Sequence, residues 1–311
     1  MLVSAPAGRE ADRWVVRTLW GLNFYGLLRV LFVVGILFLS VGLTGQDAPR
    51  AYKLFNRKGK SASYKKMLAD LRDADVILFG EYHNNPIAHW MQQEVAGDLG
   101  GYDLGLEMFE TDEQAALDRF MDGKLTVAQL DSTIGGLWPN FQTDYLPLLT
   151  QAREAGARAV ATNTPRRYAR MVFQRGFVVL QSLSALEQQE LPPLPPPYDG
   201  ELSMYKAMVT DGLGPGHASE NFPKAQAIKD ATMAWFIAKN LRSGRPMLHL
   251  NGSYHSDNYE GIGWYLRQYK PQLKVVTITT LEQPDVRKLE AASVGVADYT
   301  LLVPASMTKT Y

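Results

Sequence analysis

The stretch that decides the fold is VILFGEYHNNPIAHWMQQEVAGDLGGYDLGLEMFE, residues 76–110. It begins and ends with apolar runs, Val76–Phe79 and Leu104–Met108, which carry almost no polar side chains, as is typical of strands buried on both faces. Between them, Pro86 can begin a helix without losing a needed N–H, and apolar residues recur at helical spacing as far as Leu99. The stretch therefore predicts a strand–helix–strand unit. Because such units have right-handed crossovers, the loops that follow parallel strands lie at one edge of the sheet.

The rest of the chain repeats this alternation of short apolar runs and helical stretches. It predicts an α/β fold with a central, mostly parallel or mixed sheet flanked by helices. Helical insertions are expected near 111–145 and 200–243 as a small helical subdomain, and the proline-rich connection Leu191–Gly200 precedes the second. The predicted strands are Val76–Phe79, Leu104–Met108, Arg158–Ala161, Phe177–Leu180, Met247–Leu250, Val275–Thr279 and Thr300–Val303, and the predicted helices of the insertions are a pair within Glu113–Leu130, then Glu201–Thr210 and Lys224–Leu241.

Composition excludes several classes of protein. A chain of 311 residues, 46% hydrophobic, can bury one large core. Lys+Arg and Asp+Glu are both 32, so no net field would attract the chain to a phosphate backbone, and nucleic-acid binding is not expected. The absence of cysteine excludes disulfides, thiolate metal sites and covalent c-type haem attachment. It also excludes a lipid anchor on cysteine.

The N-terminus indicates export. Four arginines precede the apolar run Val30–Val41, and small and polar residues follow it, so residues 1–45 are expected to be a signal peptide. The alternative is an uncleaved signal anchor in contact with the membrane, although the run is shorter than the ~20 residues that a spanning helix needs. Residues 46–311 are then an α/β domain in the periplasm or cell envelope. The four arginines are Arg9, Arg13, Arg17 and Arg29.

Two G-x-x-H turns follow predicted strands. Gly80-Glu81-Tyr82-His83 comes after Val76–Phe79, and Gly252-Ser253-Tyr254-His255 comes after Met247–Leu250. Ligands of open parallel sheets bind at the carboxyl ends of the strands, and glycine lets a ligand approach the backbone closely. The imidazoles can supply a neutral nitrogen to a metal or transfer a proton. A single such turn can arise by chance, so the indication of a site comes from both turns at one edge.

An acid and an arginine are expected beside these turns. Glu107 lies in an apolar strand, where a carboxylate must be paired, ligated or protonated. Arg166 follows the strand Arg158–Ala161, and its guanidinium could hold Glu107 or an anionic group such as a propionate. A buried Glu–Arg pair is often only structural. The functional interpretation of this pair therefore depends on its place near the two histidines.

The other histidines and the tyrosines are less informative. His89 lies in the first helix, where it either turns toward the site or packs in the core. His249, inside a strand, is expected to be a core histidine, and His217 lies in a glycine-rich stretch without an evident partner. Tyrosinate can ligate ferric haem. Tyr82 and Tyr254 lie inside the two turns, but the sequence does not select a ligand among its fifteen tyrosines.

Taken in order, these motifs resemble the ChaN-like family of haem-binding, iron-regulated bacterial proteins, part of the Tiki superfamily. The resemblance extends from about Lys53 to the C-terminus. It implies a mixed α/β domain with a helical subdomain, haem binding at an interface between two copies with tyrosine and histidine near the iron, and a role in iron acquisition. The family's haem tyrosine matches no motif here, and many members are lipoproteins, unlike this chain. The motifs are Gly80–Pro86 with His89, Gly105–Phe109, Asn163–Arg166, Asp230–Ala234 and Asn251–His255.

Two functional hypotheses follow, with an envelope scaffold whose site is vestigial as a third. The first is a haem- or iron-binding protein. The second is a metal-dependent hydrolase, as other superfamily members resemble peptidases or esterases; in it a divalent ion is held by two histidines and a glutamate, Glu81 or a histidine moves a proton, and Arg166 stabilises negative charge. The residues expected to bind haem are His83, His89, Glu107, Arg166, Tyr254 and His255; those expected to hold the metal ion are His83, Glu107 and His255.

Overall fold

The computed structural model describes residues 50–210 and 220–311, so the expected signal segment and His217 lie outside the described residues. It contains the predicted unit as β2 (Val76–Glu81), α3 (Pro86–Leu99) and β3 (Asp103–Glu110). The side chain of Asn85 caps α3 by accepting from the N–H groups of residues 87 and 88, and Gly100 ends the helix with a φ of 76°.

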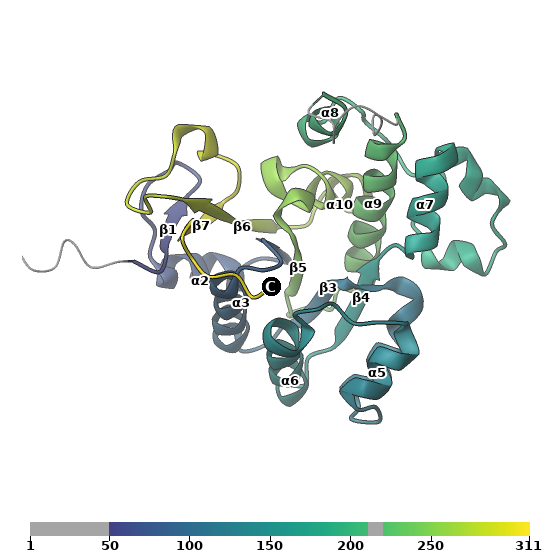
Figure 1. The fold of residues 1–311 in the computed structure, drawn as a ribbon, viewed down its shortest axis with the longest axis horizontal. Coiled ribbons are helices and arrows are strands. Elements are labelled where there is room, and N and C mark those ends of the chain that lie inside the picture. Colours follow the sequence, from purple (N-terminus) through teal and green to yellow (C-terminus); the bar gives the residue numbers. More distant parts are fainter. Residues whose placement is uncertain (1–49, 211–219) are drawn as a thin grey trace, which may run out of the picture. The chain divides into compact units, whose positions relative to one another are not determined.

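The described strands form one seven-stranded sheet in the order β1-β7-β6-β2-β5-β3-β4 (Figure 1). Only the pairing of β1 with β7 is antiparallel, so the sheet is mixed, as predicted. The two strands that end in G-x-x-H turns are direct neighbours, and Glu81 is in register with Gly252. The remaining strands are β1 (Lys53–Asn56), β4 (Ala159–Asn163), β5 (Met247–Gly252), β6 (Val275–Gln283) and β7 (Tyr299–Pro304).

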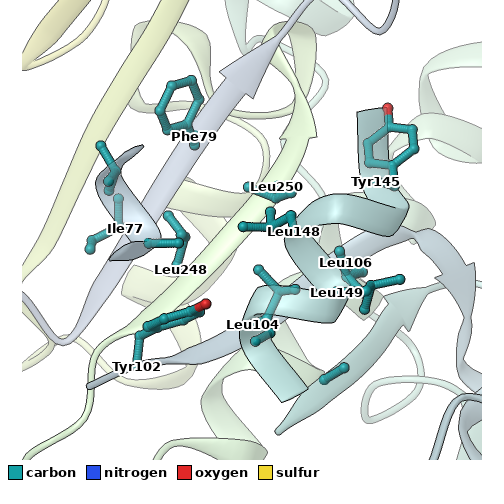
Figure 2. Packing of buried hydrophobic residues seen from close by; sticks show 14 of the residues in the cluster. Ile77, Phe79, Tyr102, Leu104, Leu106, Tyr145, Leu148, Leu149, Leu248 and Leu250 are labelled. Atoms are coloured by element: carbon teal, nitrogen blue, oxygen red, sulfur yellow. The ribbon is translucent and has the colours of Figure 1, made fainter. Parts of the chain in front are cut away.

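Alternate residues of the central strands enter two different cores. Ile77 and Phe79 pack with α3 and α6 (Leu146–Glu154), whereas Val76 and Leu78 pack with α9 (Phe222–Asn240) and α10 (Ile262–Tyr269). Since both faces are covered, these strands need apolar residues at every position. Figure 2 shows the first core, with Ile77, Phe79, Leu104, Leu106, Leu248 and Leu250 of the strands beside Leu148 and Leu149 of α6.

Helices fill the two expected insertions. α4 (Gln114–Met121) and α5 (Val127–Ile134) lie within 111–145, followed by a π-helical turn, Phe141–Tyr145. α8 (Ser203–Thr210) and α9 lie within 200–243. The remaining α-helices of the described residues are α2 (Tyr64–Arg72) and α7 (Arg166–Arg175), and no described helix is both long and apolar enough to cross a bilayer.

One predicted strand is wrong. Phe177–Leu180 is part of a 3-10 segment, Phe177–Ser182, that follows the positive-φ turn at Gly176 (φ 71°). Val179 and Leu180 are buried against α7 and α9 in a separate apolar cluster, where no sheet edge is present for pairing. Burial alone, without strand pairing, therefore explains the apolar run. The short strand β1 was not predicted, because its four residues, KLFN, carry little pattern.

Candidate functional site

The two G-x-x-H turns touch each other at the carboxyl ends of β2 and β5. A Cβ on Gly80 would lie 2.8 Å from the Cα of Ser253, and a Cβ on Gly252 would lie 3.0 Å from Nε2 of His83. The first contact is closer than side chains show, and the second would make the His83 ring move by a few tenths of an ångström. The close approach of the turns therefore requires glycine at position 80 and favours it at position 252, as their place in the motif suggests.

His83 presents one ring nitrogen at this edge. Its Nδ1 lies 2.9 Å from Oε1 of Glu81, and its side chain is 33% exposed. Because the Glu81 carboxylate accepts a hydrogen bond there, the neutral ring carries its hydrogen on Nδ1, which leaves the lone pair of Nε2 for a ligand. Burial opposes the imidazolium, but the hydrogen bond to Glu81 and the charge of Glu107 outweigh it, so the pKa of His83 is raised.

Glu81 is the buried hub behind His83. It accepts hydrogen bonds from the hydroxyl of Tyr145 and from Nε2 of Gln92, both at 2.5 Å. His89 is also buried, with Nε2 3.0 Å from the carbonyl oxygen of His83 and Nδ1 3.2 Å from the amide oxygen of Gln92. Of the two interpretations of His89, the structure combines both: it is a core residue that supports the His83 turn. It does not line the open cavity beside His83.

His255 lies between two buried carboxylates. Its Nδ1 is 2.5 Å from Oδ1 of Asp230, and its Nε2 is 3.2 Å from Oε1 of Glu107. Burial alone would lower the pKa of His255, but the charges of Glu107 and Asp230 raise it to about 10. Burial raises the pKa of Asp230, which also accepts a 2.6 Å hydrogen bond from Tyr205. A continuous polar chain thus extends from α8 to the centre of the edge.

The second G-x-x-H turn stabilises the negative charge of Glu107. Its Oε2 accepts a 2.7 Å hydrogen bond from the N–H of Gly252. Burial would raise the pKa of this carboxyl, but the positive charge of His255 holds it well below the usual range. Glu107 is therefore a buried anion with its requirements met by the second G-x-x-H turn.

The expected pairing of Arg166 with Glu107 is wrong. The Arg166 side chain is 88% exposed, its Nε is 3.9 Å from Oε1 of Glu110, and its backbone N–H donates to Oε2 of the same residue. The first turn of α7 directs this guanidinium to the surface, and Glu107 is already neutralised by His255. Arg166 and Glu107 nevertheless line one cavity of about 370 Å³, together with Lys229 and Trp138.

A second cavity is lined by His83 itself. It measures about 470 Å³ and is lined by residues 81–84, residues 252–255 and Tyr311. Tyr254 is 44% exposed there, and Figure 1 marks the C-terminus, which supplies Tyr311, beside β5 and α3. The tail is attached near His83 by the hydrogen bond from the N–H of Thr310 to the carbonyl of Asn84. Imidazole and phenol groups therefore share an accessible space.

The metal role of three residues stays a prediction. Within residues 50–210 and 220–311, no group of three or more His, Asp or Glu side chains is arranged to hold a metal ion. Oε1 of Glu107 and Nε2 of His255 point at each other, whereas Nε2 of His83 points toward Gly252, so the three groups do not converge on one point.

Several site residues were given no role from the sequence. Asp230 opens one of the motifs that resemble the family, and it is an acid within the apolar stripe of α9, as Glu107 is within β3, but it was not assigned to the site. No sequence signal indicated three aromatic residues of the site, because insertions of unpredictable geometry bring them there. They are Tyr205, Tyr145 and Trp138, and the Trp138 ring stands edge-on to His83 at 4.7 Å.

His249 is a core histidine, as expected. It is fully buried, with Nε2 2.8 Å from the hydroxyl of Thr162 and Nδ1 3.0 Å from Oδ1 of Asn251, and burial lowers its pKa to about 4. Its place inside β5 keeps it away from the cavities.

Fold and site together define an α/β protein with a histidine- and carboxylate-lined ligand edge. Comparison of the sequence with known families identifies which one: the model for the haem-binding uptake family ChaN, of the Tiki superfamily, matches residues 67–266. The chain belongs to this family. A search of curated proteins found no match.

The chain was also compared with solved structures. ChaN of Campylobacter jejuni, described with cofacial haem binding, is 19% identical with a TM-score of 0.60, over 81% of this chain and 96% of that one. A protein of Bacillus cereus is 12% identical with a TM-score of 0.45, over 82% and 95%. The erythromycin esterase EreC is 9% identical with a TM-score of 0.41, over 82% and 83%. At these identities the likeness to ChaN supports the fold alone.

Proposed function

We propose that this chain binds haem at the edge formed by its two G-x-x-H turns and serves haem or iron uptake at the bacterial envelope. Membership of the haem-binding uptake family supports the ligand. The observation that carries the proposal is His83, whose Nδ1 is held by Glu81 while Nε2 remains available beside a cavity. A carboxylate that orients a histidine in this way is typical of iron and zinc ligands.

The donor groups of the edge fit haem. Imidazole nitrogen and phenolate oxygen are both haem iron ligands, and His83 and Tyr254 offer one of each to the same cavity. Arg166 and Lys229, on the other side of the edge, are the cations that would hold propionates. Bound haem would supply the iron that an uptake protein carries, while Glu81 fixes the His83 ring and Glu107 with His255 keeps the turn beside it in place.

The envelope location rests on the sequence of residues 1–45, and the pairing of two copies is proposed from the description of ChaN as a cofacial haem binder. An open cavity suits such an arrangement, since a second copy would cover the exposed side of the ligand. Sedimentation velocity with and without haemin tests this directly. A dimer that forms on haemin addition supports the proposal, and a monomer at saturation would oppose it.

Haemin titration followed by visible absorbance tests haem binding. The wild-type chain is expected to give a saturable Soret shift, and His83→Ala and Tyr254→Phe are each expected to weaken binding at least tenfold, since a ligand contributes roughly this factor or more. Tyr52→Phe, which changes a tyrosine outside both cavities, is the matched control and should bind as the wild type does. A linear, unsaturable response, or equal binding by all four proteins, would refute the site.

A metal-dependent hydrolase is the second candidate, favoured by one observation: His255 lies between Asp230 and Glu107 in a buried acid–base array. Such arrays position imidazoles for proton transfer. Metal analysis after dialysis against Mn, Co or Zn separates the two candidates. Bound metal that is lost in His83→Ala or His255→Ala, without a Soret shift in the wild type, would favour the hydrolase over the haem protein.

A further inference from the structure

The charge of this chain is unevenly distributed. Residues 50–72 carry eight Lys or Arg and a single acid, Asp70, whereas residues 73–118 carry eleven Asp or Glu and no Lys or Arg. The balanced total of the whole chain therefore conceals a strongly basic segment at the start of the domain. Attraction to an anionic partner depends on this local excess, because charges farther apart than about 10 Å are largely screened at physiological salt.

The cations of this segment gather around β1 and the N-terminus of α2. Lys58, Lys60 and Lys65 are exposed and form no ion pair with any described carboxylate. Further cations line a surface cavity of about 900 Å³, where Ser61 and Ser63 also offer hydroxyl groups. We define the basic patch by these six residues: Arg57, Lys58, Lys60, Lys65, Lys66 and Lys274.

Three of the cations are partly engaged. Lys66 pairs with Asp70 at 2.5 Å across one helical turn, Lys274 pairs with Asp73 at 3.2 Å, and Arg57 lies 4.5 Å above the ring of Tyr259. Exposed pairs of this kind contribute little and are easily exchanged for another anion. Asp298 also lines the cavity, but it is occupied by the hydroxyl of Tyr259 and the N–H of Thr277. The patch thus keeps a clear excess of positive charge.

The sequence before the patch contains an apolar run, Val30–Val41, which ends nine residues before Arg50. At the start of β1, at the end of this strand away from Arg57, Tyr52 contacts Trp90 with ring centroids 5.5 Å apart. Trp90 is 41% exposed, and Tyr52 is partly buried. Tyrosine and tryptophan are enriched where proteins meet the lipid headgroups. A basic surface, a partly exposed aromatic pair at the start of the same strand and an apolar run earlier in the sequence favour a lipid surface over a soluble polyanion.

We infer that the basic patch docks this domain on a membrane that contains anionic phospholipids, with headgroup phosphates against its lysines and the first turn of α2. The N-terminal end of a helix adds a favourable field for anions. Each Lys or Arg near such a surface strengthens binding by about fivefold, and added salt weakens it. The inference concerns a surface separate from the haem edge and does not depend on haem binding.

The absence of cysteine provides a clean probe. In the full chain, Ser61→Cys creates a single labelling position inside the patch, and Ala185→Cys creates a matched exposed one just before the segment Glu187–Glu190, outside the patch. Each labelled protein is mixed with neutral phosphatidylcholine vesicles, or with vesicles that contain one third phosphatidylglycerol, and quenching by spin-labelled headgroups is measured. The label at 61 is expected to be quenched at least threefold more in the anionic vesicles, and the label at 185 in neither.

Charge variants identify the cause. K58Q/K60Q/K65Q should abolish the extra quenching at position 61, and 0.5 M NaCl should do the same. K124Q/R175Q/K239Q, which removes three exposed cations elsewhere, should leave it unchanged. Any of three results would overturn the inference: equal quenching at position 61 in both vesicle types, quenching that the patch variant does not change, or a patch variant that affects only the binding of duplex DNA.

Discussion

Gly252 sets how closely the two turns of the site approach each other. With no side chain, it lets the ring of His83 lie against its backbone while its N–H donates to Glu107. Its φ of −55° is available to any residue, so the requirement for glycine comes from the contact and not from the backbone conformation. We therefore expect Gly252 to matter more for the geometry of the two turns than for folding.

Gly252→Ala should therefore damage the site while the fold survives. The added methyl group would lie 3.0 Å from Nε2 of His83 and would displace the ring by a few tenths of an ångström. Haemin affinity is expected to fall at least tenfold, with about 1 kcal/mol or less lost in unfolding free energy. Gly263→Ala in α10, where a Cβ meets only atoms 3.7 Å or farther away, is the control. Unchanged haemin affinity in G252A would show that the position of the His83 ring does not matter for haem binding.

His255 makes stability depend on pH. Its folded pKa, about 10, lies above the ordinary 6.5, so its contribution is fully present below pH 6.5 and is lost as the pH rises toward 10. Between pH 6.5 and 9, wild-type unfolding free energy should fall by up to about 1.4 kcal/mol per pH unit more than that of His255→Asn. Urea unfolding at both pH values measures this difference. Parallel pH profiles would show that His255 is not held as a cation.

At the scale of the element, Asp103 joins strands at the end of the sheet opposite to the site. This carboxylate, 1% exposed at the start of β3, accepts from Arg158 at 2.9 Å and from Nε of Arg242 at 2.6 Å. Burial opposes its charge, but the hydrogen bonds to Arg242 and Arg158 hold the pKa of Asp103 below its usual range. It thereby links β3, β4 and the loop after α9.

Asp103→Asn should separate stability from ligand binding. The substitution leaves two guanidinium groups without their carboxylate and is expected to lower the free energy of unfolding by about 2 kcal/mol. This is less than for a fully buried pair, because the arginines are partly exposed. Haemin affinity should not change, since the ligand edge is at the other end of the strands. Asp122→Asn, which breaks only the exposed pair with Lys124, should cost less than about 0.5 kcal/mol. A loss of haemin affinity in D103N would show that the two ends are coupled.

Elements with a strong local signal were predictable. β2, α3 and β3 follow from apolar runs, a proline at the helix start and glycine at its end. Phe177–Leu180 failed because an apolar run is buried equally well against helices as within a sheet. For the site, the two turns and Glu107 were predictable because strand order brings them together, whereas the pairing of His255 with Asp230 depends on the placement of α9 and could not be assigned without the fold.

At the scale of the molecule, the sheet gathers unrelated segments at one edge. β2 and β5 supply the histidines, α9 supplies Asp230, α8 supplies Tyr205, and the C-terminal tail supplies Tyr311. The sequence predicted the G-x-x-H edge and the family, but it could not predict the two cavities, one lined by Glu107 and the other by His83, or the exposed position of Arg166.

The position of the iron tests the account most directly. Crystals grown with haemin and measured at the iron absorption edge would locate the metal by anomalous scattering. If haem binds at the G-x-x-H edge, we expect a peak in the cavity lined by His83 and Tyr254, within coordination distance of an imidazole nitrogen or a phenolic oxygen. A fully occupied iron bound elsewhere on the chain, with this cavity empty, would contradict it.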